Sequence, residues 1–230
     1  MNARIESPQT AAFVLNAEQG IGRIAVELPG STAVFRRLKL DFCCGGQISL
    51  QQAATEKGLD PQAVIAELAT LQRPTEISAP TDPAALVEHI LSRYHEVHRM
   101  QLPELIRMAK RVELVHRERP DVPAGLAELL ERIEAEMLSH MEKEEVILFP
   151  MLIAGGNPFV NQPIDMMRSE HVEHGRSLDA LLELTNGATP PQDACNTWRA
   201  LYSGIAQLND DLINHIHLEN NVLFPHFEAR

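Results

Sequence analysis

Several features are scarce in this chain of 230 residues, and each scarcity excludes a class of protein. The longest apolar run, around residues 146–154, is broken by Pro150 and falls well short of the roughly 20 residues that cross a bilayer. Basic residues are also few, with 20 Lys and Arg against 32 Asp and Glu. We therefore expect no membrane-spanning segment, and neither nucleic acid nor an anionic membrane as the main partner.

Cysteine is scarce too. The three cysteines, two of them adjacent at Cys43 and Cys44, do not make a disulfide framework. The first 20 residues lack a charged segment followed by an uninterrupted apolar one, so no export signal is expected. These two observations favour a reducing, cytoplasmic setting.

The remaining composition predicts an all-α chain with two domains. Residues 1–17 read as a leader, and residues 18–73 as a small helical N-terminal domain. Residues 74–82, rich in Pro, Ser and Thr, read as a linker to a larger domain over residues 83–230. The small domain buries little core by itself, so we expect it to dock on the rest or on a partner, a homodimer among the alternatives.

The larger domain is expected to be an antiparallel, up-down four-helix bundle. Short connections rich in Pro, Gly and Asn separate four long amphipathic stretches, and short connections place consecutive helices side by side. The predicted helices are Pro83–Arg117, Ala124–Leu152, Pro163–Leu184 and Pro191–Phe227. Pro103 lies inside the first helix and is expected to kink it or to force a local bulge.

One eleven-residue phrase occurs twice, at His140–Pro150 and His215–Pro225. In each copy a Glu follows the His by four residues, which places both side chains on one face of a helix, and Leu-Phe-Pro ends the phrase. The two faces are otherwise apolar stripes that we expect to be buried. These stripes are Ile133, Met137, His140, Glu144, Ile147 and Met151, and Leu208, Leu212, His215, Glu219 and Val222.

Imidazoles and carboxylates in a bundle core are costly unless they are paired or bind a metal. A single buried His–Glu pair is compatible with a hydrogen-bonded core feature, but two copies on matching stripes favour a metal site. The other two helices carry His95-x-x-His98 and His171-x-x-His174, and an approximate two-fold relation brings all four patterns to one level.

Our interpretation takes His95 and His171 as ligands and leaves His98 and His174 as lining residues. With Glu144 and Glu219 bridging two ions, the charge is balanced by an oxo bridge or two hydroxo bridges, and a coordination position stays open. If His98 or His174 bound as well, one metal would be closed. Imidazole with carboxylate suits iron best, with zinc and manganese as alternatives.

The adjacent Cys43 and Cys44 precede two glycines in the predicted small domain. The glycines allow the backbone to bring the thiols close to whatever faces the loop. Three interpretations stay open: soft-metal binding, redox change, and simple filling of a small apolar gap.

From Pro83 onward the chain resembles the hemerythrin-like family. It departs from oxygen-carrying hemerythrins at His171-x-x-His174 and His215-x-x-x-Glu219, which argues against reversible oxygen carriage. The whole chain after about residue 18 resembles the repair-of-iron-centres family (YtfE/ScdA type). The matching segments are Asp41-Phe42-Cys43-Cys44-Gly45-Gly46, Arg93-Tyr94-His95, Ser139-His140-Met141, Lys143-Glu144-Glu145, Ser169-Glu170-His171 and Leu218-Glu219-Asn220-Asn221.

That resemblance implies two non-haem iron ions and a role in restoring iron–sulfur clusters damaged by nitric oxide or peroxide. The ligands that it implies are His95, His140, Glu144, His171, His215 and Glu219. It also implies thiol chemistry at Cys43 and Cys44, a supporting or channel role for Glu170, and damaged iron–sulfur proteins as partners. Iron donation and nitric oxide reduction remain alternative activities. A module that binds or senses oxygen or nitric oxide without turnover is the competing class.

Overall fold

The computed structural model describes residues 15–28, 31–42, 44–71, 82–156 and 158–228. The predicted leader and the predicted linker therefore lie almost wholly outside the described residues, as does Cys43. The chain divides into two compact units, residues 1–76 and 77–230. Within the described ranges there is no strand beyond an isolated bridge between Gly20 and Ser49, so the all-α prediction is confirmed.

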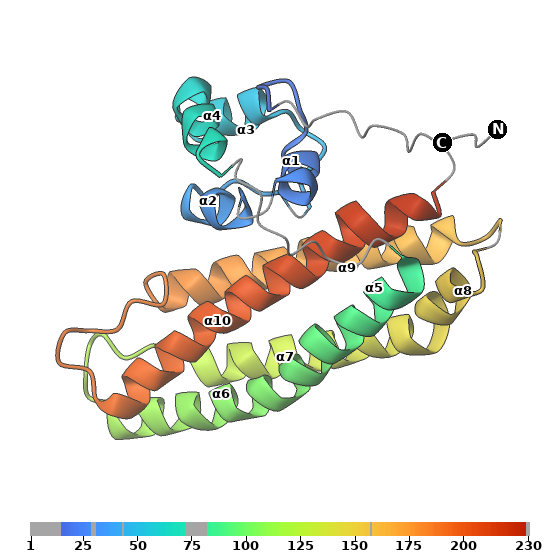
Figure 1. The fold of residues 1–230 in the computed structure, drawn as a ribbon. Coiled ribbons are helices and arrows are strands. Elements are labelled where there is room, and N and C mark those ends of the chain that lie inside the picture. The colour runs from blue at the N-terminus through green and yellow to red at the C-terminus, as the bar shows by residue number, and fades with distance from the viewer. Residues whose placement is uncertain (1–14, 29–30, 43, 72–81, 157, 229–230) are drawn as a thin grey trace, which may run out of the picture. The chain divides into compact units, whose positions relative to one another are not determined.

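The first unit consists of short helices (Figure 1). They are α1 (Ile21–Glu27), α2 (Ser31–Arg37), α3 (Leu50–Glu56) and α4 (Pro61–Ala69). Ser49 and Asp60 cap α3 and α4 by accepting hydrogen bonds from the backbone N–H groups of Gln52 and Gln62. The large side chains that are fully buried here are Ile21, Ile24, Phe35, Phe42, Leu50 and Leu68.

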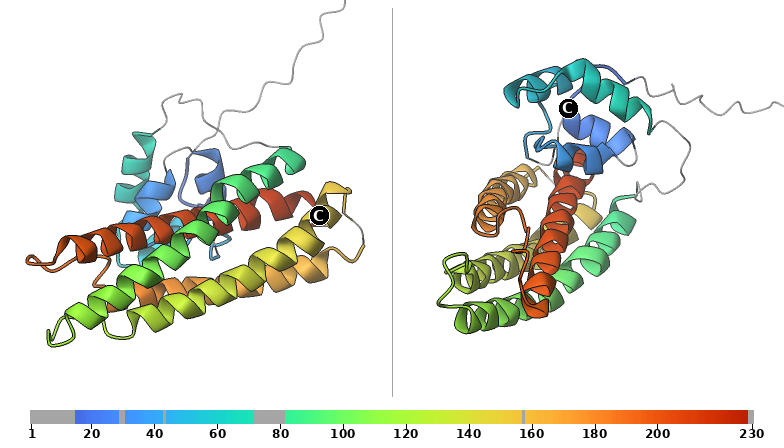
Figure 2. Two further views of the ribbon diagram at one scale, coloured as in Figure 1. Left: turned by 90° about the horizontal axis from the view of Figure 1, so that it is seen from below. Right: turned by 90° about the vertical axis from the view of Figure 1, so that its left-hand side faces the viewer.

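The second unit is a bundle of four long rods, three of which are interrupted by a wide π-helical turn (Figure 2). The first rod is α5 (Pro83–Ile90), η1 (Leu91–His95) and α6 (Glu96–Val115). The second is α7 (Leu126–Lys143), η2 (Glu144–Leu148) and α8 (Phe149–Ile153). The third is α9 (Asn161–Leu184), and the fourth is α10 (Asn196–Leu218), η3 (Glu219–Leu223) and the 3₁₀ turn η4 (Phe224–His226).

The fourth rod begins five residues later than predicted, at Asn196 instead of Pro191. Cys195 has an extended backbone at the helix start. The Arg199 guanidinium, one turn into the helix, donates to the Ala194 carbonyl at 3.0 Å. The preceding segment therefore has its own partners and does not need helical hydrogen bonds.

Contacts between the rods show that sequence neighbours run antiparallel, as predicted. Lys110 pairs with Glu131 at 2.5 Å near one end of the α6–α7 pair, whereas His95 meets Glu145 at 2.7 Å near the other. The first and fourth rods pack closely at Gly204 of α10. A Cβ added there would lie 2.6 Å from a Leu105 methyl carbon, so glycine permits this approach.

The three wide turns, as found in the described residues, occur where the predicted ligands lie. Each closes with a backbone bond to a carbonyl five residues back, from Phe149 to Glu144 in η2 and from Phe224 to Glu219 in η3. Pro150 and Pro225 contribute to these turns because each lacks the N–H that an α-helix would donate four residues back. π-Turns within α-helices are frequent at functional sites.

The wide turns correct the predicted stripes. One extra residue per turn rotates everything that follows, so Ile147 is 53% exposed and the neighbouring Leu148 is buried. Likewise Leu223 takes the core position expected for Val222. The bulge expected at Pro103 is also absent there. α6 runs through Pro103, and the wide turn of this rod lies at Leu91–His95.

An apolar cluster fills the end of the bundle next to the wide turns. We call it the apolar cluster below. Its buried members are Leu86, Val87, Ile90, Leu148, Phe149, Leu152, Val160, Ile164, Met167, Leu223 and Phe224. None of the helices in the described part of the chain is both long and apolar enough to cross a membrane.

Candidate metal centre

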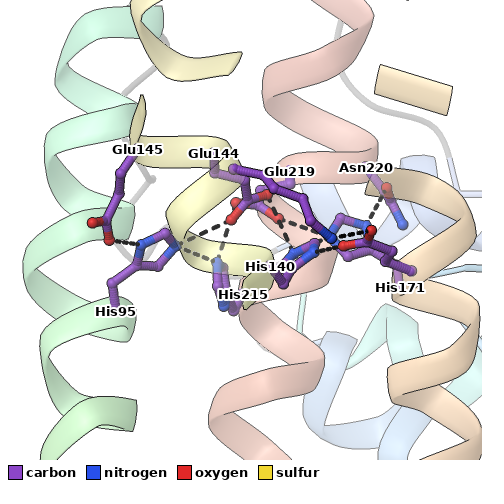
Figure 3. A network of polar contacts seen from close by, with 10 residues as sticks. His95, His140, Glu144, Glu145, His171, His215, Glu219 and Asn220 are labelled. Carbon is purple, nitrogen blue, oxygen red and sulfur yellow. Dashed lines mark hydrogen bonds and ion pairs between the residues drawn. The ribbon is translucent and has the colours of Figure 1, made fainter. Parts of the chain in front are cut away.

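The six predicted ligand side chains converge inside the bundle (Figure 3). They come from all four rods, each from a different helical element. They are His95 at the end of η1, His140 in α7, Glu144 at the start of η2, His171 in α9, His215 in α10 and Glu219 at the start of η3. All six are at most 1% exposed.

The six residues form two overlapping groups whose candidate ligand atoms lie within 4.8 Å of one another. We call the group with His95 and His215 the first position, and the group with His140 and His171 the second position. Glu144 and Glu219 belong to both groups, so each carboxylate is placed to bridge the two positions.

The carboxylate contacts follow this division. Glu144 lies 3.4 Å from the Nε2 atom of His95 and 3.3 Å from that of His140. Glu219 lies 3.0 Å from the Nε2 atom of His171 and 3.1 Å from that of His215. Each carboxylate thus contacts one histidine of the first position and one histidine of the second position.

The histidine ring contacts fit bound cations. His95 and His215 approach through their Nε2 atoms at 3.1 Å, and so do His140 and His171. In three of these rings the other nitrogen, Nδ1, faces an oxygen acceptor: Glu145 for His95, Glu170 for His140 and Asn220 for His171. In a neutral ring Nδ1 then carries the proton, and Nε2 presents a lone pair. Facing lone pairs repel unless a cation or a proton lies between them.

Orphaned acceptors point the same way. Both carboxylate oxygens of Glu144 and the Oε2 atom of Glu219 are buried, and apart from their close contacts with the candidate ligand imidazoles they have no hydrogen-bond partner among the described residues. Unpartnered buried carboxylates are costly, and a divalent ion offsets that cost. The mixture of imidazole nitrogen and carboxylate oxygen is a donor set that suits iron.

The electrostatics describe a chain in which protons take the place of metal charge. Burial alone would lower the pKa of His140, but the negative charge of Glu144 raises it to about 9. Burial and the neighbouring Glu219 would raise the pKa of Glu144, yet its contacts with His140 and His95 lower it. Both effects show that the centre favours two carboxylates balanced by positive charge.

Sequence reasoning missed two residues in the layer around the candidate ligands. Glu145 accepts from His95 at 2.7 Å and from Arg99 at 2.8 Å. Asn220 accepts from Nδ1 of His171 at 2.8 Å. Glu145 and Asn220 each directly follow a ligand Glu in the sequence, and that adjacency is the one signal that pointed to them. Such partners fix the orientation of a ligating ring and raise its basicity.

Glu170 occupies a place in this layer, next to the ligand His171. Its carboxylate accepts from Nδ1 of His140 at 2.9 Å and from Lys143 at 2.5 Å. It therefore orients the ring of a different helix from its own.

The two positions differ in one respect. Nδ1 of His215 is buried and has no hydrogen-bond partner in the described part of the chain. Its ring instead stacks on Tyr94, with centroids 5.3 Å apart and planes 8° apart. Both rings of the second position are held by a hydrogen bond, whereas only one ring of the first position is.

His98 and His174 are buried beside the centre but belong to neither group. Burial, followed by the nearby charges of His215 and His95, lowers the pKa of His98 to about 2. Burial, followed by His140 and His171, lowers the pKa of His174 to about 3. Both rings are therefore neutral at pH 7.

The structure does not test the chemistry predicted for the thiols of Cys43 and Cys44. Cys43 lies outside the described residues. Cys44 is half-buried in the loop of the first unit, where its backbone N–H donates to Asp41 at 2.9 Å. The role of both cysteines stays a prediction.

Comparison with known proteins adds two family matches. The family described as "Hemerythrin HHE cation binding domain" matches residues 86–227. The family described as "Domain of Unknown function (DUF542)" matches residues 17–72.

Individual relatives match across both units. The "Iron-sulfur cluster repair protein YtfE" of Cronobacter sakazakii is 50% identical over 210 residues, covering 90% of this chain and 95% of that protein. Proteins of the same name from Dickeya chrysanthemi and Escherichia coli O8 are each 48% identical, covering 90% of this chain and 96% of the relative. The chain therefore belongs to the repair-of-iron-centres family, whose bundle is a hemerythrin-like cation-binding domain.

Proposed function

We propose that this chain repairs iron–sulfur clusters damaged by nitrosative or oxidative stress, using two iron ions held by the six convergent side chains. The observation that carries the proposal is the pair of four-residue groups that share Glu144 and Glu219. The relatives named as iron–sulfur cluster repair proteins, which match over 90% of this chain, support the same conclusion.

The residues have distinct tasks in this proposal. His95 and His215 would hold one ion, His140 and His171 would hold the other, and the carboxylates of Glu144 and Glu219 would contribute negative charge to both. An iron pair supplies one-electron redox changes and an open position for a small ligand such as nitric oxide.

The protein around the ligands controls orientation and charge. Glu145 and Glu170 hold the His95 and His140 rings through Nδ1, and each carboxylate is itself held by a cation, Arg99 or Lys143. The apolar cluster packs against the site through Phe149, whose ring lies 5.7 Å from that of His95. This packing keeps water away from one side of the ligand set.

Iron donation and nitric oxide reduction both remain within the proposal. Donation requires that one ion leave the centre, whereas reduction requires that both stay. The unequal support of the two positions favours donation, because His215 lacks the Nδ1 anchor that the other three rings have.

The test uses the full chain reconstituted anaerobically with iron. It is mixed with a [4Fe–4S] enzyme inactivated by nitric oxide, and recovered enzyme activity, iron lost from the chain and nitrous oxide formed are measured. We expect two irons per chain and recovery of the damaged enzyme. The Glu219→Leu variant should hold no iron pair and restore nothing.

The outcomes separate the alternatives. Iron transfer without nitrous oxide identifies a donor, and nitrous oxide without iron loss identifies a reductase. Tight nitric oxide binding with neither result identifies a sensing module. A wild-type chain that binds no stoichiometric iron contradicts the proposal.

Two further expectations stay predictions beside this one. The cytoplasmic setting rests on the cysteine count, and a homodimer rests on the small size of the first unit. Fractionation of cells and light scattering of the iron-loaded chain test them.

A further inference from the structure

His98 and His174 are buried histidines that the six-ligand centre does not use. Their side chains are 0% and 4% exposed, and neither belongs to a candidate ligand group. They occupy equivalent places, because each follows a ligand histidine of its own helix by three residues, one turn further along.

Their side of the centre differs from the other side. In the residues preceding His95 and His171, the inward positions belong to the apolar cluster, including Ile90 and Met167. Beyond the ligands the inward positions are first His98 and His174 and only then leucines. The centre is therefore closed by hydrocarbon on one side and by two imidazoles on the other.

Ring contacts tie each of these histidines to one position. The His98 ring lies 5.5 Å from that of His215, which belongs to the first position. The His174 ring lies 4.8 Å from that of His140, which belongs to the second position. One imidazole thus stands beside each metal position.

These imidazoles have unsatisfied polar atoms. Neither ring nitrogen of His98 has a hydrogen-bond partner among the described residues, and neither does Nε2 of His174. A buried polar atom without a partner is costly. Leu102 and Leu178, one turn further on, show that leucine fits the same stripes. Packing alone therefore does not account for a histidine at either place.

We propose that His98 and His174 donate hydrogen bonds to a small anion or polar diatomic ligand bound at the open face of the two-metal centre. This inference rests on the proposed function, because the ligand binds the metals. Both rings carry one N–H when neutral, so each is a donor for a ligand atom on its own position. The open face is then the histidine side, and the apolar cluster is its closed back.

The test measures azide binding to the oxidised, iron-loaded chain by optical titration. We compare His98→Leu and His174→Leu with the matched variants His98→Gln and His174→Gln, which keep an N–H donor. Each Leu variant should retain two irons and weaken azide binding about tenfold, the loss expected for one hydrogen bond. Each Gln variant should recover most of that affinity.

A second readout does not involve metal. In the metal-free chain the Leu variants should unfold at higher denaturant concentration than the wild type, because each removes an unsatisfied buried polar group. Ile90→Val is the control for the apolar side and should change the azide affinity less than about threefold.

Several results would overturn the inference. Unchanged azide affinity in both Leu variants removes the hydrogen-bonding role. Loss of one iron per chain in either Leu variant makes that histidine a ligand instead. Equal weakening by Ile90→Val places the open face on the apolar side. A wild-type chain that binds no iron overturns the proposed function, and with it this inference, before any azide is added.

Discussion

The two halves of the centre have the same ligands but different support. In the second position, His140 and His171 are each held at Nδ1, by Glu170 at 2.9 Å and by Asn220 at 2.8 Å. In the first position only His95 is held in this way, and His215 is fixed by ring stacking on Tyr94.

This difference teaches that the repeat in the sequence does not make the two positions equal. A hydrogen bond at Nδ1 fixes the ring and raises its basicity, and its loss typically weakens metal binding by about 10- to 100-fold. Stacking fixes the ring without raising its basicity. The first position should therefore release its metal before the second.

The largest effect should come from the residues that the halves share. Replacing Glu144 or Glu219 with Leu removes a ligand from both positions at once, so we expect less than one iron per chain. The helices should persist, because Leu fits these buried positions and removes a costly carboxylate. Iron analysis and far-ultraviolet circular dichroism measure the two quantities. Retention of two irons would contradict the bridging assignment.

A smaller effect is expected from a substitution that makes the metal affinities of the two positions alike. Asn220→Leu removes the Nδ1 partner of His171, so the second position should lose about 10- to 100-fold in metal affinity. Iron release to a chelator should be biphasic in the wild type and close to single-phase in the variant.

The matched control for this change is Asn221→Leu. The Asn221 amide contacts His217, which is not one of the six candidate ligands, at 3.1 Å, so release should stay biphasic. Biphasic release that is unchanged in Asn220→Leu would show that the inequality has another origin.

The smallest expected effect is on the free energy of unfolding. It should depend on pH and be equal for the two positions. Partial burial would raise the pKa of Glu145, but its hydrogen bonds with His95 and Arg99 lower it. Partial burial would likewise raise the pKa of Glu170, but Lys143 and His140 lower it. A carboxyl whose pKa is lower in the folded state stabilises the fold above its unfolded pKa, and loses this effect as the pH falls through the folded pKa.

Glu145→Gln and Glu170→Gln should therefore each lower the free energy of unfolding of the metal-free chain at pH 7. We expect less than about 1 kcal/mol, because both carboxylates are partly screened by solvent. Urea unfolding at pH 7 and at pH 3 measures the change, which should shrink at pH 3. A loss much larger in one variant would show that the outer carboxylates also distinguish the halves.

The sequence predicted the all-α bundle because its signals are local. The amphipathic period and the repeated His and Glu at one-turn spacing each lie within a single helix, and the short connections lie between consecutive helices. Those same signals named the six side chains that the structure brings together, because a polar residue on an apolar stripe is conspicuous.

The rest depends on contacts between helices. The wide turn at Glu144–Leu148 exposes Ile147, which an unbroken helix would have buried. Asn220 contacts a ring on another helix, and the lack of a hydrogen-bond partner at Nδ1 of His215 among the described residues is a property of the packed core. Neither feature is marked by a residue pattern within a single helix, so the sequence alone did not predict it.

The most direct test of the central claim is a crystal structure of the iron-loaded chain with anomalous diffraction at the iron edge. We predict two anomalous peaks, one between His95 and His215 and one between His140 and His171, with Glu144 and Glu219 bonded to both ions. A single peak, or a pair of ions without a shared glutamate, would contradict the account.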